Sequence, residues 1–541
     1  MISHPRVVTS TLSAGARHIL VASCVTFLAG ASACVPPQRP ADVLVLASGA
    51  DLESPNPLIT THPLSRQVQR YALFVTLLRY DSALTPQPYY ARRWTWSADR
   101  RALTMYLVSD LRWHDGAPTT ATDAAFTFLT ARDPATGFAR ASELATLDTA
   151  VAVDDTTLVL RFRSTQAALP PLLGELPIVP AHLLARVPRG AMRRADFERS
   201  PVGNGPFKFE ARERGSSWRF TRNERFPASL GGPPALHGFV IAIVDEATTK
   251  YAGLVSGELD VAGISPTMTT LASRDKALRV VNYPVLFGTG LFFNTARTPF
   301  DDARVRRAIA RSIDRQRIVQ VALAGFGEPT SSAVPPDSPL AWEDAPGRDT
   351  ASADSLLDLA GWRRDANGIR SRNGRPLEAE LLTVGSGDNV VEQLVQADLA
   401  ARGIVLHIRQ TELGTFLTTA RAAHKSFDLL LAGIPGDLAL SQVNALFASN
   451  QRGGTLDYTG FHAPALDDAL TSASSARNDA ERRLAWRHVQ MLLDSLAPAT
   501  WLYHSRGVQG VTRRLGGARM DLRGELVTLH DWSLAPRGAG Q

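Results

Sequence analysis

Both cysteines of this 541-residue chain, Cys24 and Cys34, lie near its start, and the rest of the sequence contains none. The rest of the chain therefore has neither a disulfide framework nor a zinc or iron–sulfur site with cysteine ligands. Without covalent cross-links, it must be held together by buried apolar side chains. Its length exceeds what a single core ordinarily organises, so we expect two or three lobes.

The charge pattern argues against nucleic-acid binding. The formal net charge is +6, but the basic residues are interspersed with Asp and Glu. No block of about five or six like charges occurs, which is the pattern typical of a basic interaction arm. Arg6 and Arg17 also fall in a segment that we expect to be removed. We therefore expect a mildly basic surface and no nucleic-acid partner.

The N-terminal segment is read as a secretion signal. Residues 19–31, ILVASCVTFLAGA, form an uncharged apolar run that follows a polar start. A membrane-spanning helix needs about 20 apolar residues, and this run is shorter. It suits the apolar core of a signal peptide, which we place at residues 1–33. No later segment of the sequence is apolar enough to cross a membrane.

Two interpretations of the end of this segment compete. Ala31 and Ala33 suit ordinary cleavage after Ala33. The same stretch resembles a bacterial lipobox, in which Cys34 would be acylated and become the mature N-terminus, although Ala31 replaces the usual Leu. We favour acylation, because a lone thiol at the start of a cysteine-free chain is otherwise hard to explain. The prolines of residues 34–40 would then form a short extended tether, with the protein in the periplasm or on the outer face of the cell membrane.

The spacing of apolar residues predicts the secondary structure of the body. Helices are expected over residues 66–79 and 122–130, and at about 246–255, 301–312, 314–324, 350–360, 388–402, 412–423, 463–474 and 478–496. Strands are expected at 43–47, 103–108, 151–153, 157–162, 207–211, 217–221, 239–244, 378–384, 404–409 and 427–433. The alternation of strand and helix across 378–433 predicts parallel pairing.

Single residues carry local signals. Asp314 is expected to cap the N-terminus of the helix that follows it, and Gly361 and Gly403 to end the helices before them. Gly116 and Gly205 are expected in turn conformations that only glycine accepts at low cost.

Motifs of catalysis are missing from the sequence. It has no GxSxG elbow, HExxH pair, P-loop or dinucleotide-binding glycine pattern. The pair His114-Asp115 is interpreted as a polar turn, and Trp94-x-Trp96 as an alternating strand. We therefore expect a protein that is not an enzyme and uses no cofactor and no metal.

A series of short motifs runs through the body in a fixed order. They are Thr76–Asp81 with Ala91–Trp94, Trp113–Asp123, Pro201–Phe207, Gly257–Asp260, Phe293–Ile309, Ala360–Trp362 and Gly374–Leu377. Together they resemble family 5 of the extracellular solute-binding proteins, the oligopeptide-, dipeptide- and nickel-binding group. The motifs are mainly architectural, and Trp113 and Phe207 are expected in the core.

The resemblance implies an α/β fold of the periplasmic-binding-protein type, with two lobes around a ligand cleft and a third, smaller domain. It implies the following division: residues 41–74, 199–288 and 505–541 in lobe I, residues 289–504 in lobe II, and residues 75–198 in the small domain.

The function implied by the resemblance is ligand capture for transport. A monomeric, lipid-anchored binding protein would hold a peptide-like solute between its lobes and deliver it to the permease of an ABC importer. Two alternatives stay open. The solute could be a nickel chelate, an opine or an oligosaccharide, or the protein could act as a sensor or surface lipoprotein without transport.

The resemblance also implies ligand-binding residues. In peptide-binding members an aspartate holds the ligand's ammonium group, and the matching stretch here is Phe427–Asp437, which assigns that role to Asp437. Gly433 is expected to let a ligand approach the backbone closely. Pro435, which follows Ile434 in place of the family's Trp, has no N–H to donate to a ligand strand.

Three further positions are implied more weakly. Phe138 falls where peptide binders place an aromatic ring over the ligand, and Thr61 and Pro63 fall in an early loop that lines the cleft. The sequence assigns no partner to a carboxylate of the ligand.

Overall fold

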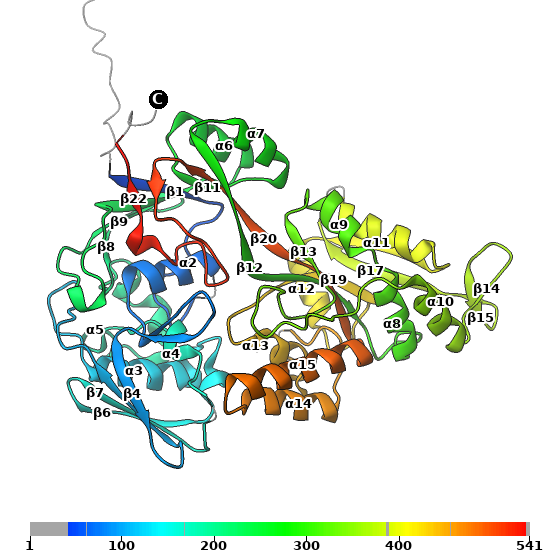
Figure 1. The fold of residues 1–541 in the computed structure, drawn as a ribbon. Coiled ribbons are helices and arrows are strands. Elements are labelled where there is room, and N and C mark those ends of the chain that lie inside the picture. The colour runs from blue at the N-terminus through cyan, green and yellow to red at the C-terminus, as the bar shows by residue number, and fades with distance from the viewer. Residues whose placement is uncertain (1–41, 61, 167, 386–388, 455, 537–541) are drawn as a thin grey trace, which may run out of the picture. The chain divides into compact units, whose positions relative to one another are not determined.

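The computed structural model describes residues 42–60, 62–166, 168–385, 389–454 and 456–536 (Figure 1). By its internal contacts the chain separates into residues 1–41 and residues 42–541, and the fold described here is that of the second unit. The signal peptide, the tether with Cys34, and Thr61 lie outside the described residues, so these predictions remain predictions.

The largest sheet in the described part of the chain has 11 strands. Ten of them follow one another in the order β18 (Val405–Thr411), β17 (Glu378–Val384), β19 (Leu429–Pro435), β12 (Leu278–Phe293), β20 (Ala499–Thr512), β11 (Val261–Gly263), β1 (Val43–Ser48), β10 (Gly238–Ile243), β9 (Ser217–Arg222) and β8 (Phe207–Glu213), and β13 (Gly327–Pro329) pairs with β20.

Two long antiparallel strands, β12 and β20, lie at the centre of this sheet and run side by side (Figure 1). Their first half pairs Leu278 with Thr512, and their second half pairs Phe292 with Ala499. The register shifts between Pro284 and Gly288, so the ladder is interrupted midway. A shift of this kind bends and twists a strand locally. These two strands therefore connect the β1–β11 side of the sheet to the β17–β19 side.

The predicted parallel pairing is confirmed. Strand β17 pairs in parallel with β18 and with β19. Helix α11 (Val390–Ala400) connects β17 to β18, and α12 (Leu413–Arg421) connects β18 to β19. Strand β19 is buried along most of its length, which explains its continuous apolar run, whereas β18 lies at the edge of the sheet and carries polar residues.

A separate four-stranded antiparallel sheet has the order β4 (Ala91–Trp96), β5 (Ala102–Leu107), β7 (Thr157–Phe162) and β6 (Leu147–Asp154). Helix α3 (Ala121–Arg132) contacts β6 and β7. Thr120 and Asp123 form a capping box at its start, which satisfies the first N–H groups of the helix. The strands predicted at 151–153 and 157–162 and the strand predicted at Trp94-x-Trp96 are confirmed.

The described residues also form the following α-helices and short strands. Helices are α2 (Pro63–Val68), α4 (Leu172–Glu175), α5 (Ala181–Leu184), α6 (Ala247–Ser256), α7 (Thr269–Arg274), α8 (Ala303–Ser312), α9 (Arg315–Ala322), α10 (Thr350–Leu359), α13 (Ser441–Phe447), α14 (Pro464–Ser474) and α15 (Asp479–Leu496). Short strands are β2 (Leu78–Tyr80), β3 (Pro86–Pro88), β14 (Arg363–Arg364), β15 (Arg370–Arg372), β16 (Arg375–Pro376), β21 (Leu515–Gly516) and β22 (Ser533–Leu534). No helix among the described residues is long and apolar enough to cross a membrane.

The local predictions at helix ends are confirmed. The Asp314 side chain accepts a hydrogen bond from the N–H of Arg317 and caps α9. Gly361 and Gly403 follow α10 and α11 with φ of +84° and +78°, the left-handed conformation that glycine adopts without strain.

The predicted helix at 66–79 is wrong in its second half. Helix α2 ends at Val68, a π-helical turn η1 (Gln69–Leu73) follows, and the chain is extended by β2. Residues 72–75, 77 and 78 are all buried. When every side of a segment is buried, its apolar pattern no longer distinguishes a helix from an extended chain.

Gly205 requires a different explanation from the one predicted. Gly116 has a φ of +96°, as expected, but the described backbone at Gly205 is not left-handed. A Cβ atom at Gly205 would lie 2.3 Å from the carbonyl oxygen of Ala72. Glycine is needed there because two backbone segments touch. Trp113 and Phe207 are fully buried, as predicted.

Candidate functional site

Asp437 lies in the turn between β19 and α13, and its side chain is almost completely buried. Oδ1 accepts hydrogen bonds from the backbone N–H of Ala439 at 2.9 Å and of Ser441 at 3.1 Å, and the Ser441 hydroxyl donates to Oδ2. The sequence folds this way because aspartate readily accepts from N–H groups two to four residues ahead. The carboxylate is therefore held in one position.

Arg140 brings Asp437 together with two glutamates. Its Nε lies 3.7 Å from Oδ2 of Asp437, and its Nη2 donates to Glu143 at 2.8 Å and to Glu175 at 2.6 Å. The side chain of Arg140 retains 11% of its exposure and that of Glu175 retains 2%. Arg140 follows α3, Glu175 ends α4, and Asp437 follows β19, so three distant segments meet at one guanidinium.

Two further arginines border the same carboxylates. Nη2 of Arg70 lies 3.6 Å from Glu175. Burial lowers the pKa of Arg66, and the negative charges of Glu175 and Asp437 offset part of that effect. Arg66 and Arg70 are one helical turn apart on α2 and η1. We call these six residues, Arg66, Arg70, Arg140, Glu143, Glu175 and Asp437, the charged cluster.

The two glutamates of the cluster differ in protonation. Burial raises the pKa of Glu143 to about 7, and its partner Arg140 offsets only part of that effect. Burial also acts on Glu175, but Arg140, Arg70 and Arg66 together lower the pKa of this carboxyl to about 2. Because charged neighbours outweigh burial only at Glu175, it stays ionised while Glu143 is partly protonated near neutral pH. The cluster then carries an excess of positive charge.

A small cavity of about 50 Å³ lies against the charged cluster. It is lined by Arg66, Arg140 and Glu175, by the half-buried ring of Phe138, and by the loop residues Pro57 and Thr60 among others. The structure therefore brings Phe138 and, through Arg140, Asp437 to one place. Thr60 is the neighbour of Thr61, which itself lies outside the described residues.

Gly433 and Pro63 do not line this cavity. Gly433 lies on β19 opposite Thr289 of β12, and a Cβ atom there would lie 2.3 Å from the ring of Phe287. Phe287 is 40% exposed, so an accessible aromatic side chain covers the backbone at Gly433. Pro63 is the exposed first residue of α2, where proline suits the helix start.

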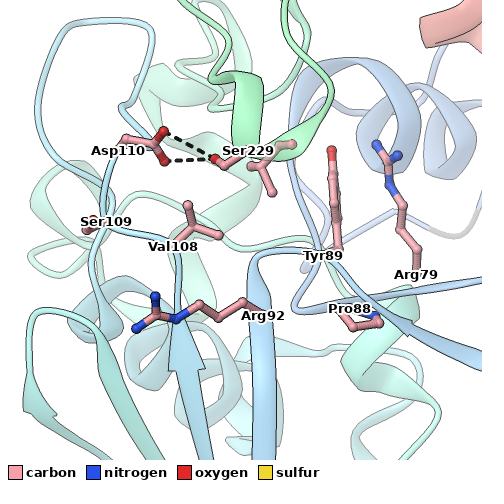
Figure 2. Close-up of a pocket in the computed structure, with 9 residues that line it drawn as sticks. Arg79, Pro88, Tyr89, Arg92, Val108, Ser109, Asp110 and Ser229 are labelled. Carbon is pink, nitrogen blue, oxygen red and sulfur yellow. Dashed lines mark hydrogen bonds between the residues drawn. The ribbon is translucent and has the colours of Figure 1, made fainter.

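A larger hollow lies elsewhere in the described structure. It has a volume of about 570 Å³ and is lined by Arg79, Tyr89, Arg92, Asp110 and Ser229 among others. Figure 2 shows that the side chains of Arg79 and Arg92 extend in different directions, while Asp110 bonds to the Ser229 hydroxyl. Because its polar groups do not converge and none of the predicted site residues lines it, the charged cluster is the better candidate for the functional site.

The sequence reasoning missed most of the cluster. Arg66, Arg70, Arg140, Glu143 and Glu175 were not predicted. A signal existed locally, since Arg66 and Arg70 have the i, i+4 spacing that puts two side chains on one helix face. Nothing in the sequence indicated that Arg70 would pair with Glu175 or that Arg140 would reach Asp437.

The described residues also hold no group of three or more metal-ligating side chains. A charged cavity that offers arginines, a carboxylate and an aromatic ring is compatible with the class of proteins that bind a small solute. The comparison with known families gives this class a specific identity. Residues 85–454, more than half of the chain, match the family described as bacterial extracellular solute-binding proteins, family 5. The chain belongs to this family of binding proteins, which act outside the cytoplasm, and it is not an enzyme.

Individual proteins resemble this chain in sequence or in fold. Protein XP55 of Streptomyces lividans is 27% identical over 96% of this chain and 94% of its own length. The oligopeptide-binding protein AppA of Bacillus subtilis, solved with a nonapeptide, is 23% identical with a TM-score of 0.75 over 91% of this chain and 98% of AppA. NikZ of Campylobacter jejuni, solved with Ni(L-His), is 20% identical with a TM-score of 0.77 over 92% of this chain and 100% of NikZ. The predicted α/β binding-protein fold is confirmed.

Proposed function

We propose that this protein captures peptide-like solutes and delivers them to the permease of an ABC importer. The observation that carries the proposal is that Phe138 and Arg140 line one charged cavity and that Arg140 contacts the buried carboxylate of Asp437. Family membership supports a binding role, and AppA, which resembles this chain over most of its length, is a binder of oligopeptides.

In this proposal Asp437 accepts the ammonium group of the peptide. An ammonium that reaches Oδ2 competes with Arg140, whose Nε lies at 3.7 Å. Arg140 has Glu143 and Glu175 as its closer partners, so it can release Asp437 without losing all of its ion pairs. The exchange of one cation for another keeps the carboxylate paired throughout binding, which avoids the cost of a lone buried charge.

The cavity must widen before a solute enters. Its volume of about 50 Å³ is far below the roughly 300–1,000 Å³ of ordinary ligand sites. We propose that residues 41–74, 199–288 and 505–541 form one lobe, residues 289–504 the second, and residues 75–198 the small domain. The register shift between Pro284 and Gly288 would then be the hinge at which β12 and β20 bend.

The proposal includes attachment to the membrane. A signal peptide at residues 1–33, an acylated Cys34 and the proline-rich tether would keep a monomeric body close to its permease. The supporting result would be that the wild-type protein stays in the membrane fraction of cells until detergent is added. The Cys34→Ala variant should no longer be found in that fraction.

Thermal unfolding in the presence of peptides tests the ligand class. A solute that binds the native state stabilises it by RT ln(1 + [L]/Kd), about 2.7 kcal/mol at a hundredfold excess over Kd. We expect a mixed library of di- to pentapeptides to raise the unfolding midpoint. If no peptide raises it while a nickel chelate, an opine or a sugar does, the peptide assignment is wrong and the binding role stands.

A further inference from the structure

The guanidinium of Arg66 has no partner in the described structure. Arg66 makes no hydrogen bond and no ion pair through its side chain with any described residue, yet it is half-buried and lines the cavity. Each of the other two arginines of the cluster has a carboxylate within 4 Å: Arg140 has three and Arg70 has Glu175.

The nearby acids are already occupied. Glu175 is shared by Arg140 and Arg70, and Asp437 accepts from Ser441 and contacts Arg140. In the adjacent loop, the Glu53 carboxylate accepts from the Thr60 hydroxyl at 2.7 Å. None of the described carboxylates forms an ion pair with Arg66, although a cation withdrawn from water needs an anion or acceptor close by.

Arginine is suited to one kind of ligand group in particular. Its planar guanidinium presents two parallel N–H donors that match the two oxygens of a carboxylate. The cavity of about 50 Å³ beside it accommodates only a group of a few heavy atoms, such as a carboxylate. The excess positive charge of the cluster favours an anionic group over a neutral one of the same size.

We propose that Arg66 anchors a carboxylate of the solute in this cavity, so that the protein selects solutes with a free acid group next to the site. The carboxylate is either the C-terminal group of a short peptide or an acidic side chain of a longer one. This inference rests on the proposed function, because it assigns the chemistry of the solute that the charged cluster receives.

Matched peptides distinguish the two sources of the carboxylate. A peptide that binds the wild-type protein is compared with its C-terminal amide and with a version whose Glu or Asp is replaced by Gln or Asn. We expect a loss of affinity of at least tenfold for whichever form lacks the recognised carboxylate. If both neutral forms bind as tightly as the parent peptide, the anchor is ruled out.

Variants of Arg66 connect this selectivity to the residue. Arg66→Met keeps an apolar stem of similar length and should bind the acid and the amide equally, at the affinity of the amide. Arg66→Lys should retain only part of the selectivity, because its ammonium is not a two-pronged donor. Full selectivity in Arg66→Met would contradict the proposal. Arg199→Met, which removes an exposed arginine, serves as the control and should bind like the wild type.

The ligand-free stability of Arg66→Met gives a readout that a structural arginine would not produce. Since Arg66 has no internal partner, its removal should leave the unfolding midpoint unchanged or raise it. A fall as large as that of Arg140→Met would show that Arg66 supports the fold, and would overturn the proposal even if peptide binding were also lost.

A final measurement separates this inference from the peptide assignment. If no peptide binds at all, acetate and succinate are used as probes, with chloride at equal ionic strength as the reference. The anchor predicts that the carboxylates raise the unfolding midpoint of the wild-type protein and not that of Arg66→Met. Absence of this difference would discard the anchor, whereas its presence would retain it and send the search to non-peptide acids.

Discussion

Arg140 and Asp437 contact each other at 3.7 Å between Nε and Oδ2, and this contact joins the segment after α3 to the turn after β19. Arg140 is also bonded to Glu143 and Glu175, so the acid expected to receive a solute already has an internal cation beside it. In the binding mode proposed above, a solute ammonium would replace Arg140 beside Asp437, which would couple the stability of the empty protein to its affinity for the solute.

Loss of Arg140 should destabilise the protein strongly. Arg140→Met leaves Glu175 and Asp437 buried with fewer partners, and breaking a buried ion pair from one side typically costs about 3–5 kcal/mol. We expect a loss of about 3 kcal/mol in the free energy of unfolding measured in urea. Arg199→Met is a matched control, because Arg199 and its i−3 partner Asp196 are 75% and 97% exposed, and an exposed pair contributes at most about 1 kcal/mol. Equal losses in both variants would mean that the buried ion pairs of Arg140 contribute no more to stability than an exposed pair.

Asp437→Asn should separate the charge of this residue from its role in the turn. The amide oxygen can still accept from Ala439 and Ser441, but the negative charge is gone. We expect peptide affinity, measured by calorimetry, to fall at least tenfold, because a hydrogen bond to a charged group contributes about 1.5–3 kcal/mol. The free energy of unfolding should fall by about 1–2 kcal/mol, which is less than the loss expected for Arg140→Met.

A control for this variant is Asp349→Asn. The Asp349 side chain accepts from the N–H of Ser352 at 2.9 Å and caps α10, so the change is chemically the same but lies outside the charged cluster. Asp349→Asn should leave the affinity unchanged. An affinity unaffected by Asp437→Asn would reduce Asp437 to an acid that only holds its turn.

Stability should depend on pH through Glu143. Its pKa rises to about 7 in the folded protein from an ordinary value of 4.5, so the folded state holds the proton more tightly than the unfolded state. The stability that this contributes is complete below pH 4.5 and is lost as the pH rises through 7. Relative to Glu143→Gln, which cannot ionise, the wild-type protein should lose up to about 3 kcal/mol between pH 5 and pH 8.

Urea unfolding of both proteins at several pH values measures this difference. Glu224→Gln, whose parent side chain is 62% exposed, should show no comparable change relative to the wild type. A difference between wild type and Glu143→Gln that stays constant with pH would contradict the buried environment of Glu143.

Gly205→Ala should destabilise more than a substitution at a glycine with unusual dihedrals. The added Cβ would lie 2.3 Å from a backbone oxygen, which cannot move aside as a side chain can. We expect a loss of about 3 kcal/mol or more, at the upper end of overpacking effects. At Gly215, with φ of +68° and open space around the position, alanine should cost only about 1–2 kcal/mol. Urea unfolding compares the two variants, and a smaller loss at Gly205 would refute the close approach of the two segments.

The sequence by itself determined the features that depend on neighbouring residues and on whole motifs. Asp314, Gly361 and Gly403 act at helix ends as predicted, since a cap involves groups only a few residues apart. The alternation of strand and helix over 378–433 predicted parallel pairing, because two neighbouring parallel strands need a crossover between them, which is usually a helix. The ordered motifs predicted the family, and hence the fold, although not the solute.

Only the tertiary structure decided which distant groups meet. The extended chain after residue 73 is buried on every side, so its apolar pattern did not reveal where the helix ends, and the long β12–β20 ladder was not predicted. The close approach at Gly205 depends on the carbonyl of Ala72, and the charged cluster depends on Arg140 reaching Glu175 and Asp437. A periodic pattern records whether a residue is buried but not what it is buried against, so contacts between remote segments remain undetermined until the chain is folded.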